Sequence, residues 1–153
     1  MTVGEAKKNL KNLERNMYGY NYEAHFGLNV LDGYKSIDEI RKELSLKYSD
    51  ARFCDIIPEL ASELDLWNSI RYGLEYRGDD VAGLKLSNEK EKELLIEQEK
   101  YKLFIQQYLT DSTVIFNYPA ESGIPYVSIL WGYSFILFNS NGTSLFINGL
   151  ASD

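Results

Sequence analysis

The last Lys or Arg of this 153-residue chain is Lys102, so the final third of the sequence has no basic side chain. This third contains the segments with the strongest strand character, rich in β-branched and aromatic residues and separated by Gly, Pro and Asn. Natural sheets commonly protect their edge strands with charged residues, above all Lys. The uncharged strands therefore need cover, either from the chain's own helices or a tight strand order, or from another protein chain.

Four strands are predicted in this region, over residues 113–118, 126–131, 133–138 and 144–148. The last two are separated by the turn-forming residues 139–142 and are typical of a hairpin. Earlier in the chain, Tyr18, Tyr20 and Tyr22 alternate with small or polar residues. Residues 18–22 are therefore either an extended segment with three rings on one face or a loop.

Four helices are predicted before the strands, from apolar residues at helical spacing. They cover residues 4–17, 37–48, about 55–72 and 88–109, the second and fourth capped by Ser36 and Ser87. In the second helix Arg41 is expected to point outward. In the third, Phe53, Leu60 and Leu64 are expected on the inner face, with a break or kink near Ile57 because of Pro58.

These elements predict an α+β fold in which a helical N-terminal two thirds packs on a C-terminal antiparallel sheet of three to four strands. The length is typical of one domain, so residues 1–153 are expected to form a single domain.

Composition excludes several classes of function. A net charge of −7 argues against a nucleic-acid partner, which would need a basic surface. One Cys and one His leave no internal disulfide and no His-rich or Cys-rich metal site, and glycine-rich nucleotide motifs are missing. We therefore expect no metal and no cofactor. The N-terminus lacks the apolar core of a signal peptide and no stretch resembles a membrane span, so the cytoplasm is the expected location.

An acidic stripe is the first candidate binding feature. Asp55, Glu59 and Glu63 are spaced i, i+4 and i+8 in the predicted third helix, with Asp50 and Asp65 nearby. Like charges at this spacing repel by a few tenths of a kcal/mol per pair, and no Lys or Arg is placed to relieve them. The stripe is either a solvated helix face or a docking site for a basic protein.

Aromatic residues are the second candidate. The chain has 12 Tyr, and Tyr126, Trp131 and Tyr133 lie on the predicted C-terminal strands. Tyr and Trp are enriched at protein-binding hot spots, but they also serve as core residues whose polar tips reach the surface. Both interpretations of these residues stay open.

Three further residues or pairs are candidates for chemistry. His25 is the only imidazole, so it is either a structural residue or the general base of an enzyme. Cys54 is expected to be buried and inert. Asp79 and Asp80 form either a cation site or an ordinary acidic turn.

In size, acidic charge and aromatic C-terminal strands such as residues 129–135, the chain resembles bacterial immunity proteins, which neutralise secreted or contact-delivered toxins. The resemblance implies a non-enzymatic cytoplasmic protein that binds a basic toxin and blocks its active site or its substrate. The residues it would use are the acidic and aromatic candidates Asp55, Glu59, Glu63, Asp65, Tyr126, Trp131 and Tyr133. The alternatives are a small enzyme or ligand-binding domain with a pocket near His25, and a homodimer formed through the uncharged strands.

Overall fold

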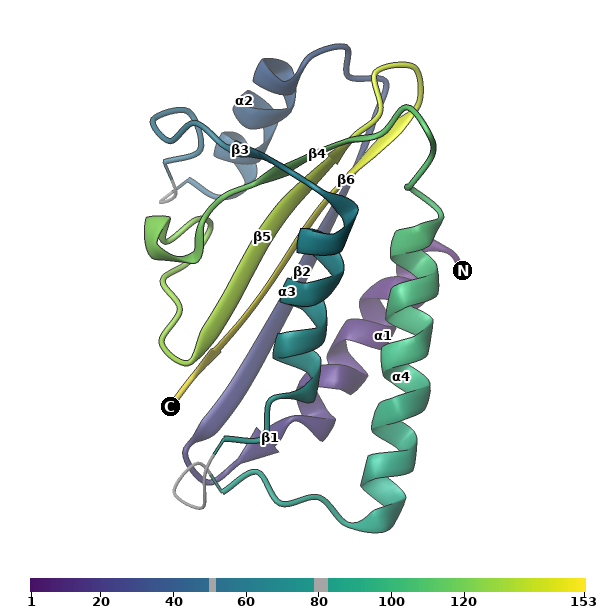
Figure 1. Ribbon diagram of the computed structural model, residues 1–153, viewed down its shortest axis with the longest axis vertical. Coiled ribbons are helices and arrows are strands. Elements are labelled where there is room, and N and C mark those ends of the chain that lie inside the picture. The colour runs from purple at the N-terminus through teal and green to yellow at the C-terminus, as the bar shows by residue number, and fades with distance from the viewer. Residues whose placement is uncertain (50–51, 79–82) are drawn as a thin grey trace.

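The computed structural model describes residues 1–49, 52–78 and 83–153. Within these ranges it has one antiparallel sheet of six strands in the order β1-β2-β6-β5-β4-β3, with helices on both faces (Figure 1). The strands are β1 (Tyr18–Gly19), β2 (Tyr22–Asp32), β3 (Glu59–Ala61), β4 (Val114–Asn117), β5 (Trp131–Phe138) and β6 (Thr143–Ser152). The helices are α1 (Val3–Asn16), α2 (Ile37–Lys47), α3 (Glu63–Glu75), α4 (Asn88–Gln106) and the 3₁₀ turn η1 (Ala120–Ser122).

Each α-helix begins after a Thr or Ser whose hydroxyl accepts a hydrogen bond from the backbone N–H three residues further on. The capping residues are Thr2, Ser36, Ser62 and Ser87. The helices predicted over 4–17, 37–48 and 88–109 are confirmed, with ends that differ by at most three residues.

The sheet separates two apolar cores. On the three-helix face it packs against α1, α3 and α4, where Leu13, Leu94 and Phe135 are fully buried. On the α2 face a smaller core forms around Ile40 and Phe146. Successive side chains of a strand point to opposite faces, so the strands contribute to both cores.

The α+β class and the antiparallel sheet are confirmed, but a helical N-terminal two thirds is wrong. The strands β1, β2 and β3 come from that region and alternate with its helices, and the sheet has six strands instead of three to four. The prediction fails mainly because of the long strand β2. Its residues Tyr22, Ala24 and Leu28 are buried on one face of the sheet, and Leu31 is buried on the other. Because β2 lies between β1 and β6, its backbone is hydrogen-bonded to strands on both sides.

The helix predicted over 55–72 is wrong in its first half, because α3 begins at Glu63. Pro58 lacks a backbone N–H and disfavours a continuous helix. Ser62 then starts a new one with a capping box in which Asp65 bonds back to the Ser62 N–H. Residues 59–61 instead form β3, which pairs with β4 and leads directly into α3 (Figure 1).

The strands predicted over 113–118, 133–138 and 144–148 are confirmed as β4, β5 and β6, and β5 and β6 form the expected hairpin. The strand predicted over 126–131 is a loop up to Trp131, since the Ile129 and Leu130 N–H groups both bond to the same carbonyl, that of Ala151. Residues 18–22 contain the β1–β2 turn, so Tyr22 is buried while Tyr18 and Tyr20 are exposed. The three rings therefore do not share a face.

The uncharged strands obtain their cover from the chain itself. β4, β5 and β6 each have a hydrogen-bonded strand on both sides, and the two outer positions belong to β1 and β3 from the N-terminal part. No helix in the described ranges is both long and apolar enough to cross a membrane.

A candidate protein-binding surface at the outer strand

The outer strand β3 and its flanking residues carry three large aliphatic side chains that are mostly exposed. Ile57, Leu60 and Leu64 are 79%, 75% and 67% exposed. They alternate along the chain with exposed acidic residues. We call this set the β3 edge surface, and it comprises Asp55, Ile57, Glu59, Leu60, Glu63 and Leu64.

The three acidic residues of the β3 edge surface are exposed. Glu63 accepts a hydrogen bond of 3.2 Å from the Trp67 indole, and its carboxylate remains largely in water. In the described part of the chain, Asp55, Glu59 and Glu63 form no ion pair with a Lys or Arg. They do not form the predicted i, i+4, i+8 stripe, because they lie in a turn, a strand and a helix start. They still lie within nine consecutive residues at one edge of the sheet.

The fourth acidic candidate, Asp65, has a local structural role. Its carboxylate accepts from the Ser62 N–H at 3.0 Å, and hydrogen bonds from Ser62 lower the pKa of this carboxyl below its usual value. Asp65 therefore caps α3, and its charge is already engaged by the helix start.

Arg41 holds the segment that leads to β3. Its guanidinium donates to the carbonyls of Phe53, Cys54 and Ile56 at 3.0, 3.0 and 2.9 Å, and it also bonds to Asp38. Its side chain is therefore turned towards the protein, in contrast to the outward position expected from the helix pattern. These bonds fix the path of the chain through residues 53–56 and so set the position of Asp55 and Ile57.

An aromatic cluster joins this segment to the loop before β5. Phe53 packs on Tyr118 and on Tyr48, and Tyr48 in turn packs edge-on against Tyr126 with ring centroids 5.8 Å apart. Tyr126 is 56% exposed, and Val127 and Ile129 beside it are also exposed. The candidate Tyr126 is thus on the surface, connected to the segment before β3 through the half-buried Tyr48 ring and the buried Phe53 ring.

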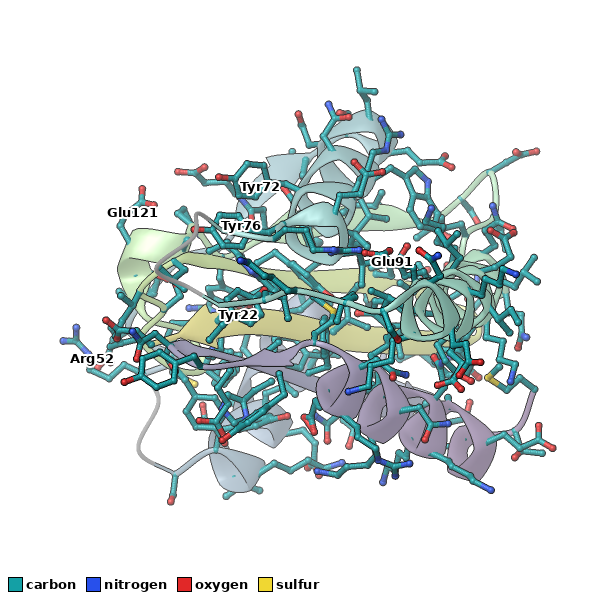
Figure 2. All side chains as sticks on the ribbon, turned by 90° about the horizontal axis from the view of Figure 1, so that it is seen from below. Tyr22, Arg52, Tyr72, Tyr76, Glu91 and Glu121 are labelled. Atoms are coloured by element: carbon teal, nitrogen blue, oxygen red, sulfur yellow. The ribbon has the colours of Figure 1, made fainter. Side chains whose placement is uncertain are left out.

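Trp131 and Tyr133 lie in the core, so the structure does not place them on a binding surface. The Trp131 indole donates to the Tyr22 hydroxyl at 2.7 Å, and the hydroxyls of Tyr133 and Tyr101 are 2.6 Å apart. Burial raises the pKa of Tyr22 to about 12. Figure 2 shows Tyr22, Tyr76 and Tyr72 in a row that leads towards α3 and the surface, and the Tyr22 and Tyr76 rings are stacked 5.7 Å apart.

The residues considered for catalysis are not brought together. His25 is exposed on β2, where its Nε2 lies 3.5 Å from the Glu23 carboxylate. Cys54 is exposed, in contrast to the expected burial, because the Arg41-bound turn directs Phe53 inward instead. Asp79 and Asp80 lie outside the described residues. Among the described residues, no three His, Cys, Asp or Glu side chains are grouped so that they could hold a metal ion.

An open hollow of about 490 Å³ lies between the end of α4 and the β5–β6 turn. It is lined by Gln107, Tyr108, Thr110, Ser112, Asn139, Ser140, Asn141, Gly142 and Thr143. None of these described residues supplies a carboxylate, imidazole or amine, and His25 does not line the hollow. The Thr110 and Ser112 hydroxyls in its lining bond to each other at 3.2 Å, and the Asn139 amide donates to the Tyr108 and Thr143 carbonyls.

The exposed aliphatic residues of the β3 edge surface were missed by the sequence analysis. Leu60 and Leu64 were assigned to the inner face of a helix that does not extend to residue 60. The available signals were Pro58 and the Ser62–Asp65 capping pair, which together predict a helix start after residue 61.

Comparison with known proteins identifies no family. No family model matches the chain, and no curated protein matches it. Among solved structures, citrus MAF1 aligns over 95% of this chain and 99% of its own, at 13% sequence identity and a TM-score of 0.33. A likeness of this size carries no argument about fold or function.

Proposed function

We propose that this protein is a non-enzymatic, immunity-type protein that binds a basic toxin and neutralises it. The observation that carries the proposal is the β3 edge surface, where Ile57, Leu60 and Leu64 are exposed among carboxylates that form no ion pair with any described Lys or Arg. Exposed aliphatic groups gain free energy when a partner covers them, and unpaired carboxylates attract a cationic surface over a distance of several ångströms. The proposed partner is a toxin domain with a basic surface, met in the cytoplasm.

The proposed surface includes Tyr126 but not Trp131 or Tyr133. Tyr126 is exposed and joined to the segment before β3 by the aromatic cluster, and an aromatic ring of this kind gives large contact area at low entropic cost. Asp65 contributes by capping the first turn of α3, in which Glu63 and Leu64 lie.

The first experiment identifies the partner and measures the binding rate. The protein is used to capture its partner from the native host, and the product of the neighbouring reading frame is tested for binding and for growth inhibition. The association rate with that toxin is then measured at low and at physiological salt for the double variant Glu59→Lys, Glu63→Lys. We expect at least tenfold slower association at low salt, with a weaker dependence on salt concentration.

A matched control separates the position of the charges from their number. The variant Glu93→Lys, Glu99→Lys makes the same change in net charge at exposed positions of α4, away from β3. If the two double variants associate at the same rate, the β3 edge surface is not the docking site. If neither the neighbouring gene product nor any captured protein is a toxin, the immunity function is refuted.

A further inference from the structure

We infer that β3 binds its partner by strand addition, as the acceptor for an extended segment in which aliphatic residues alternate with Lys or Arg. The inference rests on the proposed function and specifies the kind of contact made by the same surface. In this mode an added strand hydrogen-bonds to the free side of an edge strand, and alternate side chains provide specificity.

The first support is the place of β3 in the sheet. In the described part of the chain β3 pairs with β4 alone, through Glu59, Leu60 and Ala61, so its other side has no strand. The opposite edge is more restricted, because the segment at Gly83 lies directly against Tyr20 in the β1–β2 turn. A side chain at residue 83 would come within 3.0 Å of the Tyr20 backbone nitrogen. Of the two outer strands, β3 is also the longer, and its Glu59 and Leu60 are exposed.

The second support is the chemistry of the two faces of β3. Leu60 is opposite Phe116 and shares the α2 face with it, while Glu59 shares the three-helix face with Ala61. A strand added next to β3 would place one side chain beside Leu60 and the next beside Glu59. Cross-strand pairs are favourable when both are apolar or when their charges are opposite. The complementary sequence therefore alternates aliphatic and basic residues.

The third support concerns the identity of the occupant. A second copy of this chain paired through β3 would bring a second set of Asp55, Glu59 and Glu63 to the same edge. Like charges facing each other across strands are destabilising, and these carboxylates form no ion pair in the described structure that would relieve the repulsion. A cationic segment of another protein would instead form favourable pairs with these carboxylates. The charge pattern thus selects a basic partner over self-association.

The test uses a nine-residue peptide of alternating Lys and Val, with blocked ends, and the isotope-labelled full-length protein. We expect binding that shifts the backbone amide signals of residues 57 and 59–61 and slows hydrogen exchange in β3. A second peptide has the same side chains but a methyl group on every peptide nitrogen. It therefore keeps the charge of the first peptide but has no backbone N–H to donate to β3. Its affinity is expected to be at least tenfold lower. The variant Leu60→Lys should also bind the first peptide at least tenfold more weakly, whereas Leu95→Lys on α4 should not.

The outcomes separate this inference from the proposed function. Equal affinity for the two peptides, signal changes that are absent or lie away from β3, or a dimer of the free protein that Leu60→Lys dissociates, would each overturn strand addition. None of these results affects the toxin association rates, which test the proposed function independently. Conversely, strand addition of the peptide, together with a search in which neither the neighbouring gene product nor any captured protein is a toxin, would refute the proposed function alone.

Discussion

Replacement of Arg41 by Met tests whether one side chain holds the segment that leads to the β3 edge surface. The Arg41 side chain is 13% exposed, and its bonds to the Phe53 and Ile56 carbonyls, at 3.0 and 2.9 Å, are partly buried. Met has a similar apolar length but donates no hydrogen bond. The variant therefore removes the donors and largely retains the packing of the side-chain stem.

The magnitude follows from the two partly buried bonds. A hydrogen bond to a charged group contributes about 1.5 kcal/mol or more to stability, so their loss costs about 3 kcal/mol. The exposed bonds to the Cys54 carbonyl and to Asp38 add little, because water replaces Arg41 there. For a chain of this length, a loss of about 3 kcal/mol lowers Tm by about 6–12 °C.

The assay is urea unfolding followed by circular dichroism, with the thermal midpoint as a second measurement. Lys42→Met is the control, since Lys42 is the exposed neighbour of Arg41 on α2. Arg41→Lys should give an intermediate loss, because Lys retains the charge without the planar fork that reaches several carbonyls. A free energy of unfolding for Arg41→Met within about 0.5 kcal/mol of the control would refute the reasoning.

Three further predictions concern the core, alkaline pH and the exposed leucine. Gly73→Ala should destabilise the protein by about 1 kcal/mol or more, because the new methyl group lies 2.7 Å from the Trp131 ring and this overlap outweighs the gain in helix propensity; higher stability in urea unfolding would contradict it. Burial raises the pKa values of Tyr22 and Tyr118 to about 12, so their contribution to stability is complete below pH 10, the unfolded value, and is lost as pH rises towards 12. Urea unfolding from pH 8 to 12 should show this fall, and constant stability across the range would exclude it. Leu60→Lys should leave the free energy of unfolding within about 0.5 kcal/mol of wild type, whereas a loss above 1 kcal/mol would show that Leu60 serves folding.

The elements that could be predicted from the sequence are those set by local interactions. The Ser36 and Ser87 caps bond to N–H groups three residues away, and the β5–β6 hairpin closes over a short turn rich in Asn and Gly. These signals involve residues close in sequence, so reading the chain locally is sufficient.

The remaining elements depend on contacts between distant residues. β2 is a strand because β6 pairs with it across more than a hundred residues, and β3 is a strand because β4 does so across more than fifty. The role of Arg41 could not be predicted for a similar reason, since its carbonyl partners lie 12 to 15 residues along the chain, beyond the reach of a helix pattern. Trp131 and Tyr133 were ambiguous for the same reason, since only the position of α3 and α4 over the sheet decides that they are buried.

The distribution of charge along the chain follows the position of each strand in the sheet. β4, β5 and β6 have hydrogen-bonded neighbours on both sides, so no free edge exists there for Lys or Arg to protect. Protection is needed at the outer strands, where β1 has two residues and β3 has three, preceded by Pro58. On β3 the protecting charge is negative, from Glu59, instead of the more common Lys. A negative edge repels copies of itself as effectively as a positive one, but it attracts a strand of opposite charge. The negative charge at β3, together with the exposed Leu60, therefore favours a partner strand that is basic and aliphatic over a second copy of this chain.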